Sequence, residues 1–180
     1  MPQKPKKRSK VVWLTGVSGA GKSTIAQYMQ KMHGYDQCMI LDADIARALW
    51  PELGLSDRDR SQNVRRLGAL AFMLASQMDN VLILVANIAP FIADRRANQK
   101  LIMQAADYYE VYIHAPLIRR LERDPKGLYD KAVRGEIQGL TGYDGVYEQS
   151  PSALLLSIDT SRHSPGECAS LILETLETID

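Results

Sequence analysis

The strongest chemical signal in this sequence is the run of residues 16–24, Gly-Val-Ser-Gly-Ala-Gly-Lys-Ser-Thr, which fits G-x-x-x-x-G-K-[ST] without a mismatch. Glycines let such a loop wrap its backbone N–H groups closely around phosphate. Lys22 can then reach the β- and γ-phosphates, and the Ser23 hydroxyl can bind Mg²⁺. We therefore expect ATP or GTP to bind here with Mg²⁺. The expected phosphate-binding residues are Gly16, Ser18, Gly19, Ala20, Gly21, Lys22, Ser23 and Thr24.

Two carboxylates, Asp42 and Asp44, closely follow the apolar run 38–41. That run predicts a buried strand, and parallel α/β sheets bind their ligands at the carboxyl ends of the strands. One carboxylate could hold Mg²⁺ through water, while the other could orient or deprotonate the hydroxyl of an acceptor. An aspartate in this place can also cap the next helix, and the two roles are compatible.

A helix with a basic beginning is expected from residue 57 onward. Ser56 and the acidic residues behind it are typical of a helix start, and apolar residues then recur at three- and four-residue spacing as far as Met78. The early turns carry Arg58, Arg60, Asn63, Arg65 and Arg66. These side chains form either a solvated basic face or a site for the anionic group of a second substrate.

The elements that must position these groups alternate between strands and helices. The apolar runs 11–14 and 81–85 predict buried strands, because neither alternates with polar residues. The other expected elements are helices over 24–32, 94–106, 116–123 and 165–179, and strands over 108–114 and 153–158. Ser164 and Glu167 predict a capping box on the last helix. This order predicts an α/β fold of the three-layer P-loop NTPase type, with a five-stranded parallel sheet covered by helices on both faces.

Residues 124–149 differ from the rest of the chain, because they are rich in Gly, Lys, Asp and Tyr and show little periodicity. A segment of this kind between a helix and the last strand is expected to be a lid. Residues 1–10 are polar and basic, which favours a disordered leader over a segment that binds a polyanion. Residues 11–180 are expected to form a single domain.

Composition argues against several other classes of protein. A net charge of +1 makes no electrostatic case for nucleic acid or membrane as a partner. The sequence has no apolar run of about 18 residues and no apolar signal-peptide segment behind its basic start, so a cytoplasmic protein is expected. Cys38 and Cys168 lie far apart in no metal-binding spacing and are expected to be free thiols.

Several motifs together resemble the adenylylsulfate kinase family over nearly the whole chain after the leader. The motif 123–129, Arg-Asp-Pro-Lys-Gly-Leu-Tyr, is the most specific to that family, whereas the phosphate-binding loop fits many kinases. The other matching segments are 41–44, 59–66, 88–91 and 140–142. The resemblance implies an enzyme that uses ATP and Mg²⁺ to phosphorylate the 3′-hydroxyl of adenosine 5′-phosphosulfate, giving 3′-phosphoadenosine 5′-phosphosulfate. It also implies a homodimer, since several members of the family are homodimers.

The same resemblance assigns roles to individual residues. Lys22, Asp42 and Asp44 are implied to be catalytic, and Ser23 and Asp42 are implied to lie at the metal. Arg123 is implied to lie near the adenine of ATP. The residues implied to bind the acceptor nucleotide, either in its pocket or from the lid, are Arg47, Leu55, Arg60, Asn63, Asn87, Ile88, Lys126, Leu128 and Leu140.

The chain departs from the family pattern on the acceptor side, while the ATP side matches. Leu55 and Leu140 stand where the family has two aromatic rings that sandwich the adenine of the acceptor, and stacking on an aromatic ring is worth about 1–3 kcal/mol per base. Ile45 replaces an asparagine, Ala89 replaces a serine, and Ile92 replaces an arginine. The acceptor pocket is therefore expected to differ from that of the family.

Three functions are compatible with these residues. The first is an adenylylsulfate kinase with a modified acceptor pocket. The second is the same 3′-hydroxyl transfer to another nucleotide, for example a cytidine 5′-diphosphate derivative such as a phosphoramidate used in capsule modification. The third is a nucleotide-binding module without catalysis, and the intact Lys22, Ser23, Asp42 and Asp44 argue against it.

Overall fold

The computed structural model describes residues 8–35, 37–150 and 154–179, and within these residues five parallel strands form one sheet. The strand order is β2-β3-β1-β4-β5. The strands are β1 (Ser9–Thr15), β2 (Gln37–Asp42), β3 (Val81–Ala86), β4 (Ala106–His114) and β5 (Leu154–Asp159). The helices are α1 (Lys22–Met32), α2 (Ala43–Ala46), the 3₁₀ turn η1 (Arg47–Leu49), α3 (Asp57–Gln77), α4 (Ile92–Ile102), α5 (Leu117–Arg123), α6 (Leu128–Val133) and α7 (Pro165–Thr178). The predicted fold class is confirmed.

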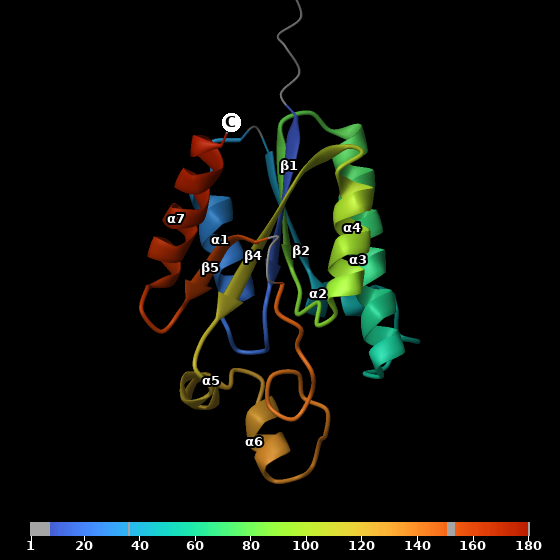
Figure 1. The fold of residues 1–180 in the computed structure, drawn as a ribbon, viewed down its shortest axis with the longest axis vertical. Helices are drawn as coiled ribbons and strands as arrows, with labels where there is room; N and C mark the ends of the chain where they lie inside the picture. Colours follow the sequence, from blue (N-terminus) through green and yellow to red (C-terminus); the bar gives the residue numbers. More distant parts are fainter. Residues whose placement is uncertain (1–7, 36, 151–153, 180) are drawn as a thin grey trace, which may run out of the picture.

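Helices cover both faces of the sheet, with α1 and α7 on one side and α3 and α4 on the other (Figure 1). Along β1, Val11 and Trp13 belong to the hydrophobic core beneath α3, whereas Val12 and Leu14 belong to the core beneath α1 and α7. Successive strand residues point to opposite faces, so a strand buried on both faces must be apolar at every position. This burial explains the unbroken apolar runs of β1 and β3, which are fully buried.

The first strand begins two residues earlier than expected, so the assignment of Ser9 and Lys10 to a disordered leader is wrong. Both residues are buried, because β1 pairs with β4 from Ser9 onward. Their polar groups are satisfied by distant backbone: Ser9 Oγ donates to Met78 O at 2.8 Å, and Lys10 Nζ donates to Leu176 O at 3.0 Å. Residues 1–7 of the expected leader lie outside the described residues.

Other boundaries shift by a few residues. The helix expected to reach residue 106 ends at Ile102, because a turn follows and β4 already begins at Ala106. The capping box is confirmed: Glu167 N–H donates to Ser164 Oγ at 3.3 Å, and Ser164 N–H donates to Glu167 Oε2 at 2.7 Å. Both cysteines are free thiols in the described part of the chain.

Replacing Gly68 with alanine is expected to lower the free energy of unfolding by about 2–4 kcal/mol. Gly68 lies on α3 where α4 crosses it, and an added Cβ would lie 2.1 Å from Asn98 Oδ1. Asn98 cannot move without cost, because its buried side chain donates to Val64 O at 2.8 Å. Urea denaturation measures the change. Gly34→Ala is the matched control, since its Cβ would meet nothing within 4 Å; equal denaturation midpoints for the two variants would contradict this account.

Candidate active site

A cavity of about 550 Å³ opens at the carboxyl ends of β1, β2 and β3 and is bordered on its far side by the segment between α5 and β5. Of the residues predicted for the site, those that line the cavity are Ser18, Gly19, Gly21, Lys22, Ser23, Thr24, Asp44, Arg47, Leu55, Arg60, Asn63, Asn87, Ile88, Arg123, Lys126, Leu128 and Leu140. Gly16, Ala20 and Asp42 do not line it. The fold therefore gathers most of the predicted residues into one space.

The phosphate-binding loop has a shape that only glycine permits at its start. At Gly16, φ is +140°, and a Cβ would lie 1.9 Å from Ile113 O of β4. Gly19 and Gly21 also have positive φ, at +72° and +100°. Gly16 packs against the sheet, and Ala20 is fully buried with its carbonyl accepting from Thr160 Oγ1 at 2.9 Å. These two residues shape the loop from behind rather than contact the cavity.

Lys22 places a buried cation at the cavity. Its Nζ donates to Val17 O at 2.8 Å. Burial lowers the pKa of Lys22 to about 8, against the opposing pull of the nearby Asp44 and Asp42 carboxylates. This desolvated ammonium has further N–H groups that can donate hydrogen bonds. The β- and γ-phosphates of a nucleoside triphosphate are suitable acceptors for them. The loop geometry and this cation therefore fit ATP.

The two carboxylates have different positions. Asp42 caps α2, because its Oδ1 accepts from Asp44 N–H at 2.8 Å, while its Oδ2 accepts from Ser23 Oγ at 2.5 Å. Asp44 borders the cavity and forms an ion pair with Lys126 of the predicted lid. Asp42 thus combines the capping role with a position beside the loop hydroxyl, and Asp44 is the carboxylate that a substrate can reach.

Ser23 and Asp42 also fit a magnesium ion. Their oxygen atoms already lie next to each other, and hydroxyl and carboxylate oxygens are the hard ligands that Mg²⁺ prefers. The described residues contain no cluster of three His, Cys, Asp or Glu side chains that could hold a metal by themselves. Such a sparse donor set is typical of Mg²⁺ bound largely through water and nucleotide phosphates.

Two buried asparagines border the cavity, and the side-chain nitrogen of each has no partner among the described residues. Asn63 is 2% exposed and Asn87 is 6% exposed, and the Nδ2 atom of each lacks a hydrogen bond there. A buried N–H without an acceptor costs free energy. Both amides are therefore suited to donate to a bound molecule. Arg47, which donates to Gly54 O at 2.9 Å, adds a positive charge to the same wall.

The basic residues at the start of α3 fall into two groups, one that lines the cavity and one that forms ion pairs with other side chains. Arg60 lines the cavity and donates to Thr141 Oγ1 at 2.9 Å and to Gly139 O at 2.7 Å. Arg65 and Arg66 instead form ion pairs with Asp94 and Glu52. Only the face that carries Arg60 and Asn63 meets the cavity, so the anion-binding interpretation applies to part of the helix.

Residues of the predicted lid border the cavity, and this segment contains the short helix α6, which the sequence did not indicate. Its own small core consists of Tyr129, Ala132 and Leu140. The Tyr129 hydroxyl donates to Ser18 O at 2.8 Å, which joins the lid to the phosphate-binding loop. Leu55 is 69% exposed at the rim, whereas Leu140 is buried. Neither leucine offers an aromatic face to a base.

Thr160 was missed by the sequence analysis. Its Oγ1 donates to Ala20 O and accepts from Arg123 Nη1 at 2.8 Å, while Arg123 Nη2 donates to Thr160 O at 2.7 Å. Thr160 thereby fixes the guanidinium of Arg123 beside the phosphate-binding loop. Thr160 directly follows β5. The rule that ligands bind at the carboxyl ends of parallel strands identified Asp44, and the same rule could have identified Thr160.

Comparison with known proteins gives a consistent result. The family model described as adenylylsulphate kinase matches residues 8–159. An adenylyl-sulfate kinase of Pseudomonas aeruginosa is 41% identical over 180 residues, covering 96% of this chain and 88% of the relative. The structure of the APS kinase of Mycobacterium tuberculosis in complex with AMPPNP and APS has a TM-score of 0.86 at 38% identity, covering 95% of this chain and 99% of that one. The hexameric APS kinase from Thiobacillus denitrificans has a TM-score of 0.70 at 27% identity, covering 97% of this chain and 30% of that one.

Proposed function

Because the chain belongs to the adenylylsulfate kinase family, we propose that it transfers the γ-phosphoryl group of ATP to the 3′-hydroxyl of adenosine 5′-phosphosulfate. The products are ADP and 3′-phosphoadenosine 5′-phosphosulfate. The observation that carries this proposal is the shared cavity, whose lining includes the phosphate-binding loop, Asp44, Arg47 and two asparagines whose Nδ2 atoms have no partner among the described residues. That arrangement serves a kinase with a small anionic acceptor.

In the proposed reaction the 3′-oxygen of the acceptor bonds to the γ-phosphorus while the bond from that phosphorus to the β–γ bridging oxygen breaks. Loop N–H groups and the Lys22 ammonium stabilise the charge on the phosphoryl oxygens. Asp44 orients the 3′-hydroxyl and accepts its proton. Ser23 and Asp42 would hold Mg²⁺, which would supply further neutralisation of the phosphate charge. The lid excludes water, which would otherwise compete as acceptor.

The remaining site residues support the two nucleotides on opposite sides. We assign Arg123, fixed by Thr160, to the adenine side of ATP. We assign Arg47, Arg60 and Asn63 to the phosphosulfate end of the acceptor, because these side chains line the same wall. The lid residues Lys126, Leu128 and Leu140, with Leu55, Asn87 and Ile88, are assigned to the rest of the acceptor.

A second candidate function is the same transfer to a different nucleotide, such as a cytidine 5′-diphosphate derivative. Leu55 and Leu140 border the cavity where aromatic rings would stack on adenine. Asn87 offers a hydrogen-bond donor instead, since its Nδ2 has no partner among the described residues. A pocket that relies on hydrogen bonds rather than stacking favours a base with a matching acceptor atom. A module without catalysis is disfavoured by the joint presence of Lys22 and Asp44 at the cavity.

An assay of ADP release decides between these functions. The protein is given ATP, Mg²⁺ and one acceptor from a panel that contains adenosine 5′-phosphosulfate, cytidine diphosphate derivatives and a blank. Efficient turnover of adenosine 5′-phosphosulfate supports the first function. Turnover with another nucleotide only supports the second, and ADP release that no acceptor stimulates would contradict both.

The rim leucine offers a direct test of the modified pocket. Leu55→Phe is expected to lower KM for adenosine 5′-phosphosulfate by about fivefold or more and to leave KM for ATP unchanged, because the new ring can stack on the adenine. Steady-state kinetics with each substrate varied in turn measures both constants. Leu49→Phe is the control, since Leu49 is similarly exposed, at 67% against 69%, and does not line the cavity. An equal effect of both substitutions would contradict the assignment of Leu55 to the acceptor pocket.

We further propose that the enzyme acts as a homodimer in the cytoplasm, where ATP is available. The described helices include none long and apolar enough to cross a membrane. The family resemblance supports the dimer, and the hexamer from Thiobacillus denitrificans is a different assembly of a relative. Sedimentation equilibrium of the full chain distinguishes monomer, dimer and larger assemblies.

A further inference from the structure

Residues 147–150, here called the strap, span the end of the predicted lid and contact the chain that leaves β3. Glu148 N–H donates to Pro90 O at 2.9 Å, and Ile92 N–H donates to Glu148 Oε2 at 2.7 Å. The neighbouring residues 87–90, here called the acceptor loop, contribute Asn87, Ile88 and Pro90 to the wall of the cavity. The strap is therefore bonded to the back of the wall that the acceptor would contact.

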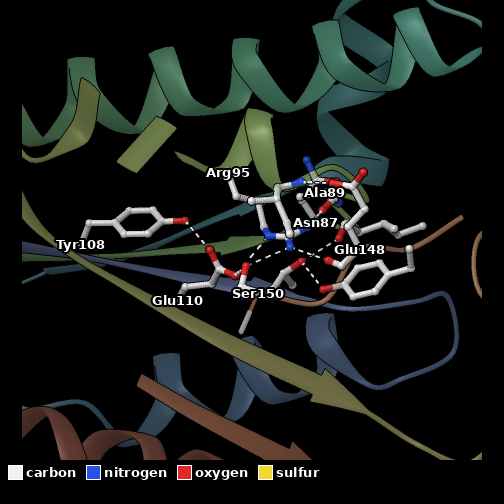
Figure 2. A network of polar contacts seen from close by, with 11 residues as sticks. Asn87, Ala89, Arg95, Tyr108, Glu110, Glu148 and Ser150 are labelled. Atoms are coloured by element: carbon white, nitrogen blue, oxygen red, sulfur yellow. Dashed lines mark hydrogen bonds and ion pairs between the residues drawn. The ribbon is translucent and has the colours of Figure 1, made fainter. Parts of the chain in front are cut away.

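A buried arginine joins the strap to the acceptor loop (Figure 2). Arg95 is 1% exposed, and its Nη1 donates to Ala89 O. Its Nη2 donates to Glu148 O at 2.5 Å and to Ser150 Oγ at 2.9 Å. Its Nε donates at 3.1 Å to Glu110 Oε1, a buried carboxylate that balances its charge. One planar guanidinium thus fixes the acceptor loop, the strap and β4 relative to one another.

A second connection runs through Thr15 at the end of β1. Thr15 Oγ1 lies 2.7 Å from Ile88 O and 2.9 Å from the Tyr147 hydroxyl. A carbonyl oxygen can only accept, so the single hydroxyl proton of Thr15 is donated to Ile88 O, and Tyr147 must donate to Thr15. Thr15 is fully buried, and hydrogen bonds that run in one direction through such an environment strengthen one another. The Tyr147 hydroxyl therefore supports the carbonyl of a residue in the cavity wall.

The acceptor loop has a backbone that needs this support. Ala89 has φ of +45°, a left-handed conformation that is unfavourable for a residue with a Cβ. Its N–H donates to Asn87 Oδ1 at 3.1 Å, which sets the orientation of the Asn87 amide. The Nδ2 of that amide is the atom without a partner among the described residues. The geometry of the loop and the direction of this donor are therefore linked.

We propose that Tyr147 and Arg95 are positioning residues for the acceptor nucleotide, acting through the acceptor loop. Tyr147 acts through Thr15 on Ile88, and Arg95 acts on Ala89. Asn87 then presents to the acceptor its Nδ2, which has no partner in the described part of the chain. The inference rests on the proposed function in that it places the acceptor at this wall. Among the described contacts, Arg95 and Tyr147 make no direct bond to residues 16–24. The one link through Ile88 is long, since Gly16 N–H donates to Ile88 O at 3.4 Å, so we expect a larger effect on the acceptor than on ATP.

Tyr147→Phe tests the proposal, because it keeps the ring and removes only the hydroxyl. We expect KM for the acceptor to rise by about three- to tenfold, with kcat and KM for ATP within about twofold of the parent. Tyr112→Phe is the matched control: Tyr112 stacks on Tyr147 with ring centroids 5.5 Å apart, and its hydroxyl accepts from Gln149 Nε2 at 3.1 Å. This control also removes a hydrogen bond to the strap, but a bond that is not part of the connection to the acceptor loop. The proposal would be overturned if Tyr147→Phe and Tyr112→Phe had the same KM for the acceptor. It would also be overturned if Tyr147→Phe raised KM for ATP as much as KM for the acceptor.

A double-mutant cycle tests whether Tyr147 acts through Thr15. Thr15→Val removes the relay at nearly constant volume, and adding Tyr147→Phe to it should raise the acceptor KM no further. Thr15→Ser, which keeps the hydroxyl, should restore the acceptor KM to within about twofold of the parent. Independent, multiplying effects of Thr15→Val and Tyr147→Phe would show that the two side chains act separately, against the proposal.

Hydrogen exchange of the protein without substrates separates this inference from the proposed function. Peptides that cover the acceptor loop should exchange faster in Tyr147→Phe than in Tyr112→Phe, whatever the acceptor is. If the parent turns over no acceptor of the panel, the proposed function fails while this measurement still decides whether the strap holds the loop. Identical exchange in the two variants would overturn the inference.

Discussion

Replacing Lys22 with alanine is expected to reduce phosphoryl transfer by about a thousandfold or more. The Lys22 ammonium is buried beside the phosphate-binding loop, where it meets the charge that grows on the transferring group. Three other cations at the cavity, Arg60, Arg123 and Lys126, are engaged with Thr141, Thr160 and Asp44. The measurement is kcat for ADP formation with saturating ATP and acceptor. Near-normal turnover would remove Lys22 from the mechanism.

Lys22→Met is the control for Lys22→Ala, because it removes the charge of the side chain and keeps most of its packing. Methionine fills nearly the same volume without a charge, so it should lose as much activity as alanine while it leaves no cavity. Because burial lowers the pKa of Lys22 to about 8, the folded protein disfavours the charged form of this side chain. We therefore expect Lys22→Met to unfold at a urea concentration no lower than the parent. A large loss of stability would show that the activity lost reflects a damaged fold.

Replacing Asp44 with asparagine is expected to lower kcat by about a hundredfold to a thousandfold, with KM for ATP changed by less than about threefold. The carboxylate borders the cavity, whereas that of Asp42 is engaged with the loop serine and the α2 N-terminus. An amide of the same shape cannot accept the proton of the 3′-hydroxyl. An unchanged kcat would exclude Asp44 as the proton acceptor.

The ion pair between Asp44 and Lys126 requires its own control, because asparagine also weakens the attachment of the lid. Lys126→Gln removes the same ion pair and leaves the carboxylate in place. An exposed ion pair is worth about 1 kcal/mol or less, so this variant should lose no more than about fivefold in kcat. If Lys126→Gln reproduced the loss seen with Asp44→Asn, the effect would belong to lid closure and not to proton transfer.

Local patterns in the sequence were sufficient for the phosphate-binding loop, the strands that surround it and the caps of α3 and α7. Each of these depends on residues within a few positions of one another. Glycine at 16, 19 and 21 permits backbone angles that other residues resist. Ser56 and Ser164 satisfy N–H groups three residues ahead. Unbroken apolar runs identify strands that are buried on both faces, so they also predicted the parallel sheet.

The position of Asp44 at the cavity also followed from the sequence, because the carboxyl ends of parallel strands share one edge of the sheet. The same rule extends to Thr160 after β5, but a lone threonine carries little chemical signal in a sequence. Leu55 and Leu140 were recognised by comparison with the family motifs and not by any pattern of their own. Their different exposure at the cavity became clear only in the folded chain.

Tertiary structure alone decided the contacts between residues far apart in the chain. Lys10 resembled part of a polar leader, yet it is buried in β1, where its ammonium donates to Leu176 O of α7. For Arg95 the sequence predicted only a place in a helix, whereas in the fold this residue bonds to Ala89, Glu110 and Glu148. A buried polar side chain is stable only if its partners are present, and those partners are brought near by the fold. The sequence by itself therefore determined which residues could do chemistry, and the tertiary structure decided which distant residues hold them in place.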